Sequence, residues 1–120
     1  MSNVLIVDDS STMRKIIARS LRQAGFVVGE VFEAGDGIEG LNSLDANKVD
    51  LVLSDINMPN MDGLEFVRAV RGKGSKVPIV MITTEGGEDV INEAIASGAT
   101  DSIRKPFTPE QLQEKLGGML

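Results

Sequence analysis

Three short runs of apolar, mostly β-branched residues constrain the fold of this chain more than any other feature. They are Val4–Val7, Leu51–Leu53 and Ile79–Ile82, and none contains a polar residue. Uninterrupted apolar runs of this length are typical of strands buried on both faces of a parallel sheet. Two more polar stretches, Val27–Glu33 and Thr100–Arg104, are weaker strand candidates. We therefore expect the apolar runs at the centre of the sheet and the polar stretches at its edges.

Helical periodicity marks the segments between these runs. Apolar residues recur three and four positions apart, which places them on one face of a helix. The first such segment has Ser10 or Ser11 as its cap and Gly25 as its stop, and the last begins with the capping-box sequence Thr108-Pro109-Glu110-Gln111. The repeating positions are Met13, Ile16, Ile17 and Leu21, then Leu64, Val67 and Val70, and then Val90, Ile91, Ala94 and Ile95.

Strands that alternate with helices predict successive βαβ units in an α/β fold. With the apolar runs central and the second strand beside the first, the sheet order becomes 2-1-3-4-5. We therefore predict a flavodoxin-like three-layer sandwich, with a five-stranded parallel sheet and five helices, formed as one domain by residues 1–120. In sheets of this order, ligands bind beyond the carboxyl ends of the first and third strands.

Composition removes several classes of function. The 120 residues include no histidine and no cysteine, which excludes a Ser-His or Cys-His hydrolase, a thiol nucleophile and a Cys/His zinc site. The net charge of −6 argues against binding to the phosphate backbone of nucleic acids. No apolar run is long enough for a membrane span or a signal peptide, so we expect a cytoplasmic protein that does not contact a membrane. We also expect it to be a monomer that does not bind nucleic acid.

Polar residues follow the expected strands on the side where ligands bind. Asp8-Asp9 follows the first strand, Asp55 the third, Thr83-Thr84 the fourth and Lys105-Pro106 the fifth. Two like charges about 4 Å apart repel by about 4 kcal/mol at an effective dielectric constant of about 20. A fold keeps three carboxylates together only where cations offset them, and Lys105 supplies one positive charge.

The donor atoms at this edge are oxygens of carboxylates, hydroxyls and backbone carbonyls. Such ligands suit Mg²⁺, which takes one or two carboxylates together with water and phosphoryl oxygens. A carboxylate, Mg²⁺, a lysine and a threonine hydroxyl together are typical of phosphoryl transfer, in which a carboxylate nucleophile needs no histidine base. We therefore expect a phosphoryl-transfer site with Mg²⁺ as its cofactor.

Four groups of residues resemble the receiver domains of two-component response regulators. They are Val7-Asp8-Asp9, Asp55 with the stretch Met58–Gly63, Thr83, and Lys105-Pro106-Phe107. The resemblance covers the whole chain and is strongest to the single-domain chemotaxis regulators, through Ser11-Thr12-Met13-Arg14 and Asn57–Glu65. It implies a signalling domain that catalyses only its own phosphorylation and dephosphorylation.

The resemblance implies that Asp55 accepts the phosphoryl group and that Thr83 and Lys105 contact it, with a cis bond between Lys105 and Pro106. The donor in this family is a phosphohistidine of a sensor histidine kinase (CheA-like), which fits a chain without histidine. The output goes to a protein target, such as the flagellar motor switch, through the face formed by the fourth helix, the fifth strand and the fifth helix.

The same resemblance implies the ligands of the metal. Asp9, Asp55 and the backbone carbonyl of Asn57 bind Mg²⁺ directly, and Asp8 acts through water. Asn57 also stands at one of two positions that tune hydrolysis of the phosphoryl group in this family.

Three further positions are expected to carry the switch. Glu85 stands at the second position that tunes hydrolysis. Ser102 replaces the aromatic residue that the chemotaxis regulators usually have three residues before Lys105, and Thr84 replaces a smaller residue. Because both substitutions lie on the path from Thr83 to the output face, the phosphorylation chemistry is expected to be intact and the readout to differ.

Two other classes of function stay open as alternatives. The stretch Gly35-Asp36-Gly37-Ile38-Glu39-Gly40 satisfies the G-x-G-x-x-G pattern of a nucleotide-binding domain, although Asp36 and Glu39 would repel a pyrophosphate. Its structural interpretation is a turn and the start of a helix. The second alternative is a phosphatase with an aspartyl nucleophile, which would need a substrate cap that no insertion in this chain is long enough to form.

Overall fold

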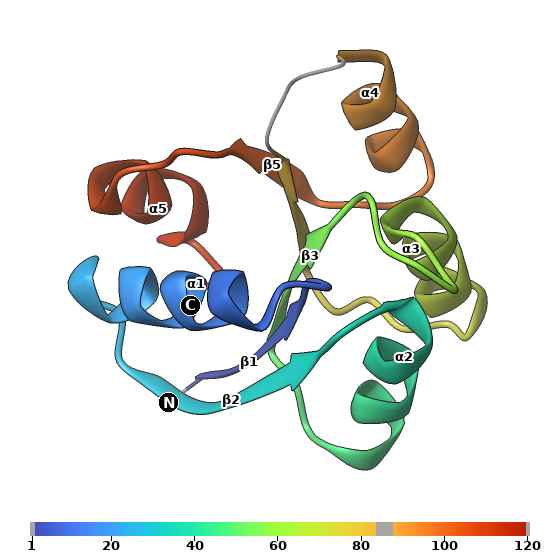
Figure 1. Cartoon of the computed structure of the whole chain (residues 1–120), viewed down its shortest axis with the longest axis horizontal. Coiled ribbons are helices and arrows are strands. Elements are labelled where there is room, and N and C mark those ends of the chain that lie inside the picture. The colour runs from blue at the N-terminus through green and yellow to red at the C-terminus, as the bar shows by residue number, and fades with distance from the viewer. Residues whose placement is uncertain (1, 84–87, 120) are drawn as a thin grey trace.

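Strands and helices alternate along the whole chain in the computed structural model, which describes residues 2–83 and 88–119. The elements are β1 (Ser2–Val7), α1 (Ser11–Gln23), β2 (Val28–Ala34), α2 (Gly37–Ala46), β3 (Leu51–Asp55), α3 (Gly63–Gly72), β4 (Ile79–Thr83), α4 (Glu88–Ala96), β5 (Asp101–Arg104) and α5 (Pro109–Leu116). The strands pair in parallel in the order β2-β1-β3-β4-β5, so the predicted fold is confirmed. Helices α1 and α5 cover one face of the sheet, and α2, α3 and α4 cover the other (Figure 1). Within the part of the chain that the structure describes, no helix has the length and hydropathy that crossing a membrane requires.

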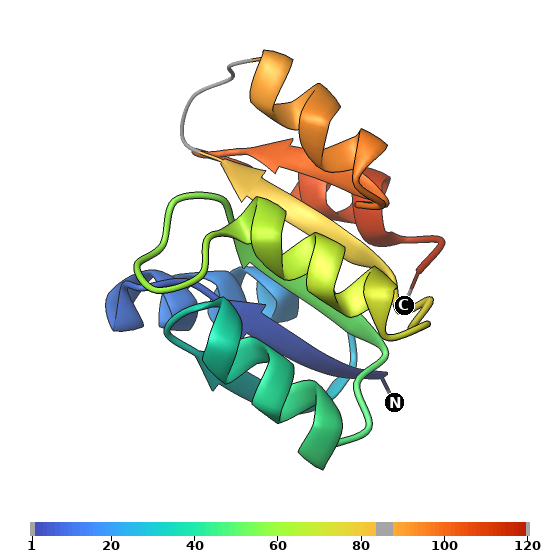
Figure 2. The ribbon, with the colours of Figure 1, turned by 90° about the vertical axis from the view of Figure 1, so that its right-hand side faces the viewer.

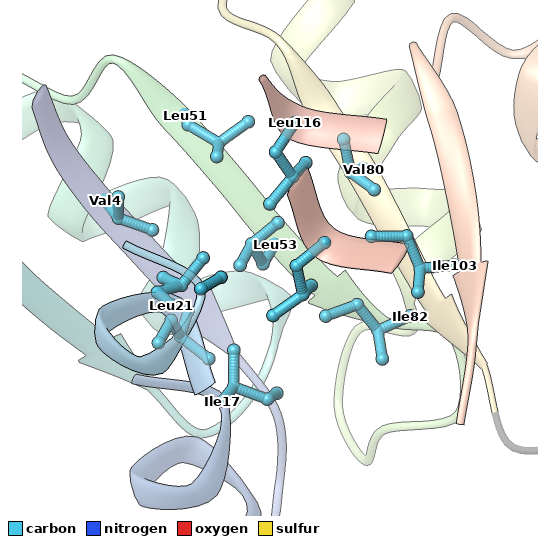
Figure 3. Close-up of a cluster of buried hydrophobic side chains, with 12 residues drawn as sticks. Val4, Ile17, Leu21, Leu51, Leu53, Val80, Ile82, Ile103 and Leu116 are labelled. Atoms are coloured by element: carbon cyan, nitrogen blue, oxygen red, sulfur yellow. The ribbon is translucent and has the colours of Figure 1, made fainter. Parts of the chain in front are cut away.

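Both faces of the central strands are buried, as their uninterrupted apolar sequences predict. In β1, Val4 and Ile6 pack under α1 and α5, whereas Leu5 and Val7 pack under the other three helices. Leu53 of β3 lies at the centre of the cluster of buried side chains under α1 and α5 (Figure 3). Each of these side chains is 0% exposed, and full burial of a side chain of this size contributes about 1.5–3 kcal/mol.

Side-chain caps determine where the helices begin. Ser10, rather than Ser11, caps α1, because its Oγ accepts the Met13 N–H at 3.2 Å. The predicted capping box between Thr108 and Gln111 is present at the start of α5. Just beyond α1, Gly25 has a φ of 92°, a left-handed conformation that glycine adopts without strain.

The edge strands and α4 differ in detail from the prediction. β2 begins one residue after Val27, which is 73% exposed, because pairing with β1 starts there. β5 begins one residue after Thr100, whose N–H donates to the Ile79 carbonyl at 2.7 Å and whose Oγ1 accepts the Ile79 N–H at 3.0 Å, so that both groups bind the first residue of β4. Val90 and Ile95 belong to the periodic apolar pattern of α4, yet they are 37% and 42% exposed.

Candidate functional site

Three carboxylates meet beyond the carboxyl ends of β1 and β3. Asp8 and Asp9 follow β1 directly, Asp55 ends β3, and the register of these two strands places Val7 beside Ser54. One ligand oxygen from each carboxylate lies within 4.8 Å of the others. Asp8 is buried, Asp55 is half-buried and Asp9 is exposed. The cluster is therefore anchored in the fold at one end and open to solvent at the other.

Lys105 reaches this cluster although it follows β5, two strands away from β3. Its Nζ lies 3.3 Å from Oδ2 of Asp8, and the side chains of the two residues are 10% and 3% exposed. The backbone N–H of Lys105 donates to the Thr83 carbonyl at 2.6 Å, which ties the loop to the end of β4. The Lys105–Pro106 bond is cis, as expected. The fold thus holds one ammonium group against three carboxylates.

The electrostatics of Asp55 reflect this imbalance of charge. Burial raises the pKa of the Asp55 carboxyl, and the charges of Asp8 and Asp9 raise it further. A hydrogen bond from the Ile56 N–H at 2.7 Å and the charge of Lys105 act in the opposite direction on this pKa without cancelling the rise. Negative charge at Asp55 is therefore under-compensated by the protein. The oxygen donors and the surplus negative charge fit a hard divalent cation such as Mg²⁺.

The sequence matches known proteins across the length of the chain. Residues 4–117 match the model of the response regulator receiver domain. The chain belongs to this family. The receiver domain is 46% identical over 116 residues to chemotaxis protein CheY1 of Helicobacter pylori, covering 94% of this chain and 92% of that protein. It is 45% identical over 120 residues to the chemotaxis protein CheY homolog of Campylobacter jejuni, covering 98% and 91%.

Solved structures show the same likeness. The receiver domain superposes on the chemotaxis protein CheY4 of Vibrio cholerae with a TM-score of 0.87 at 42% identity, over 100% of this chain and 99% of the other. A response regulator from Chloroflexus aurantiacus, described as putative, matches with a TM-score of 0.86 at 31% identity over 98% and 96% of the two chains. The chain is thus a CheY-like receiver of two-component signalling.

Of the other expected site residues that the structure describes, two follow or end strands at the edge where the carboxylates lie, and one lies within a strand. Thr83 ends β4 and is 7% exposed, and Asn57 lies exposed in the loop after β3. Ser102 lies half-buried on β5 beside Met81, within a strand and not at its carboxyl end. Thr84 and Glu85 lie outside the described residues, so their expected roles stay predictions.

Arg14 is a residue of this site to which the sequence pattern assigned no role. Its Nη1 donates to the backbone carbonyl of Asp8 at 2.6 Å, and its Nε donates to Oε1 of Glu33 at 2.9 Å. The side chain therefore joins the end of β1 to the end of β2 from the first turns of α1. In the sequence, the one sign of this contact was a cationic residue about one helical turn after the cap Ser10, seven residues beyond the end of β1.

The glycine-rich stretch 35–40 forms the cap and the first turn of α2 and packs closely against its neighbours. Oδ1 of Asp36 accepts the Glu39 N–H at 2.8 Å, and a carboxylate oxygen of Glu39 accepts the Gly35 N–H at 3.3 Å. The Glu39 N–H and then the Asn60 side chain hold the pKa of Asp36 below its ordinary value. Because carboxylates occupy the amides that a pyrophosphate would need, the nucleotide-binding alternative is not supported.

Gly40→Ala tests whether this glycine is required by packing. A Cβ at Gly40 would lie 2.8 Å from Cε1 of Phe66 and 3.2 Å from Cγ2 of Val7, and both neighbours are 0% exposed. We expect the variant to lose about 1–3 kcal/mol of unfolding free energy, as overpacked cores do, in a urea titration. An unchanged unfolding midpoint would contradict the packing interpretation.

Proposed function

We propose that this receiver domain accepts a phosphoryl group from a phosphohistidine of a sensor histidine kinase onto Asp55, and then signals by binding a protein target in a chemotaxis pathway. The grouping of Asp8, Asp9 and Asp55 beside Lys105 carries the proposal. The kinship with CheY proteins of Helicobacter pylori and Campylobacter jejuni supports the pathway.

In the proposed transfer, an oxygen of the Asp55 carboxylate attacks the phosphorus atom. A carboxylate is ionised at neutral pH and needs no base. The new phosphorus–oxygen bond forms as the phosphorus–nitrogen bond breaks, and the electron pair goes to a protonated ring that leaves as neutral imidazole. The Lys105 ammonium group and the Thr83 hydroxyl stabilise the negative oxygens of the group in transfer.

The residues that would hold a divalent cation are all oxygen donors. Asp9, Asp55 and the Asn57 carbonyl would bind Mg²⁺ directly, and Asp8 would bind it through water. When bound, the cation neutralises negative charge on the carboxylates and on the phosphoryl oxygens. The pairing of Asp8 with Lys105 and the greater exposure of Asp9 and Asp55 support this division between direct and water-mediated ligands.

The face of α4, β5 and α5 offers a surface for the protein target. Val90 and Ile95 of α4 are exposed although they are apolar. Between β5 and α5 a hollow of about 350 Å³ is lined by Ser102, Ile103, Arg104, Pro106, Gln111, Glu114 and Lys115. An apolar helix face beside a polar hollow is typical of a protein-binding surface.

Phosphotransfer from a kinase tests the proposed function. A chemotaxis histidine kinase is first loaded with a radiolabelled phosphoryl group and separated from nucleotide. On addition of this chain and Mg²⁺, the label is expected to leave the kinase and appear on the chain. A label that stays on every such kinase and never reaches the chain would contradict the proposal.

Ser102 makes a specific prediction about the switch. Serine has no ring to move into the fold. The conformational difference between the unphosphorylated and the phosphorylated protein should therefore arise near Thr83 and the start of α4, with little change in β5. Backbone NMR with and without beryllofluoride, a phosphoryl mimic, should show large shifts at Glu88 and Asp89 and small shifts at Ser102 and Ile103. The reverse pattern would contradict this expectation.

A further inference from the structure

The loop between β3 and α3 is tied to the first turn of α2. Nδ2 of Asn60 donates to Oδ2 of Asp36 at 2.8 Å, and the Gly37 N–H donates to the Met61 carbonyl at 3.1 Å. The Met61 side chain also packs against Gly37, where a Cβ would lie 2.6 Å from its Cγ. These contacts join the tip of the loop to an element that contributes no ligand to the carboxylate cluster.

The same loop carries the Asn57 carbonyl and begins directly after Asp55. Its base is closed, because the Gly63 N–H donates to the Ile56 carbonyl at 2.7 Å. A side chain at Gly63 would collide with the Asp55 carbonyl, so the two ends of the loop lie against each other. With the base closed, the loop is held beyond β3 by the contacts at its tip and by the packing of Met58 and Met61 against the core. In Figure 2 this loop projects beyond the strands toward the start of α2.

Asp36 is buried with both carboxylate oxygens bonded, whereas Asn60 is exposed and has an unusual backbone conformation. Asp36 is 6% exposed, and its two carboxylate oxygens have different partners, the Glu39 N–H and the Asn60 side chain. Asn60 has a φ of 65°, a left-handed conformation in which asparagine is among the few tolerated residues. Capping α2 requires only one oxygen, which serine would also supply. The second oxygen of Asp36 is therefore available for the loop.

We propose that Asp36 and Asn60 form a latch that positions the loop and thereby sets the affinity of the carboxylate cluster for Mg²⁺. The latch residues are positioning residues and not ligands, and they act through the Asn57 carbonyl and the direction of Asp55. The inference rests on the proposed function, in which these groups bind the cation. Partners that orient metal ligands change metal affinity by about 10- to 100-fold when they are removed.

Asn60→Gly removes the latch without changing the net charge and keeps the left-handed backbone accessible. In an NMR titration with Mg²⁺ followed at the amides of Asp9 and Ile56, we expect roughly tenfold weaker binding than in the wild type. The double variant Asp36→Asn/Asn60→Asp reverses the direction of the hydrogen bond, retains an oxygen to cap α2 and keeps the net charge. It is expected to bind Mg²⁺ within about twofold of the wild type, since the latch is restored.

Val70→Ala is the control for loss of stability alone. Val70 is a 1% exposed core residue about two turns into α3, so its truncation lowers the melting temperature, but it is neither a latch residue nor a member of the carboxylate cluster. We expect its affinity for Mg²⁺ to equal that of the wild type. An Asn60→Gly variant that binds Mg²⁺ as tightly as the wild type would overturn the latch. A double variant that binds Mg²⁺ as weakly as Asn60→Gly would also overturn it, as would a Val70→Ala variant that loses the same affinity. Absence of Mg²⁺ binding in the wild type would overturn the metal site of the proposed function as well.

Discussion

Asp55→Asn is expected to abolish phosphorylation of the receiver domain completely and to leave its fold intact. Asparagine has nearly the shape of aspartate but lacks the carboxylate that attacks phosphorus, and its Oδ1 can still accept the Ile56 N–H. Without divalent cations the variant should also melt a few degrees higher than the wild type, because burial and the charges of Asp8 and Asp9 disfavour the Asp55 carboxylate. Phosphate-affinity electrophoresis and thermal melts measure the two effects.

Asp45→Asn is the matched control for this variant. Asp45 is an exposed carboxylate on α2 that forms an ion pair with Lys73 at 3.0 Å, and such surface pairs contribute about 0–1 kcal/mol. Its phosphorylation should be that of the wild type. Labelling of Asp55→Asn at the wild-type rate would show that another residue accepts the phosphoryl group.

Asp9→Ala is expected to remove the stabilisation that Mg²⁺ gives to the wild type. We expect a dissociation constant on the order of 1 mM. Free Mg²⁺ at about ten times this constant then stabilises the folded state by about 1.4 kcal/mol, since the cation binds only the folded site. A domain of this size should then melt several degrees higher. Because Asp9 is the exposed carboxylate of the cluster and its replacement leaves the core untouched, the variant should fold but show no such shift.

Differential scanning fluorimetry with and without Mg²⁺ measures this effect. Glu114→Ala removes an exposed carboxylate from α5, outside the cluster, and should keep the full shift. If Asp9→Ala keeps the full shift as well, the cation binds at a place other than the carboxylate cluster.

The centre of the fold could be predicted from the sequence because strands that are buried on both faces consist of uninterrupted apolar residues. Val4–Val7 and Ile79–Ile82 admit no polar residue, and the structure buries every one of these residues. The edges were less predictable, because hydrogen bonds to a neighbouring strand decide where an edge strand begins. Val27 and Thr100 have residue types that suit a strand, but pairing with β1 begins at Val28, and the hydroxyl of Thr100 takes the place of a backbone carbonyl as the acceptor of the Ile79 N–H.

In the candidate site, the positions that follow from strand order could be predicted from the sequence, whereas the contacts that depend on side-chain packing could not. Asp8, Asp9, Asp55 and Lys105 could be brought together from strand order alone, since parallel strands present their carboxyl ends at one edge. The contact of Arg14 with the Asp8 carbonyl could not be derived from periodicity. Nor could the contact between Asp36 and Asn60, because each joins elements whose relative position depends on side-chain packing.

The most direct test of the central claim is the intact mass of the wild-type protein before and after incubation with Mg²⁺ and acetyl phosphate, a small phosphodonor. We predict the gain of a single phosphoryl group, which is lost on treatment with hydroxylamine, as expected for an acyl phosphate on Asp55. The gain should depend on Mg²⁺ and should disappear in Asp55→Asn. No gain in mass under these conditions, or a gain that resists hydroxylamine, would contradict the assignment of Asp55 as phosphoacceptor.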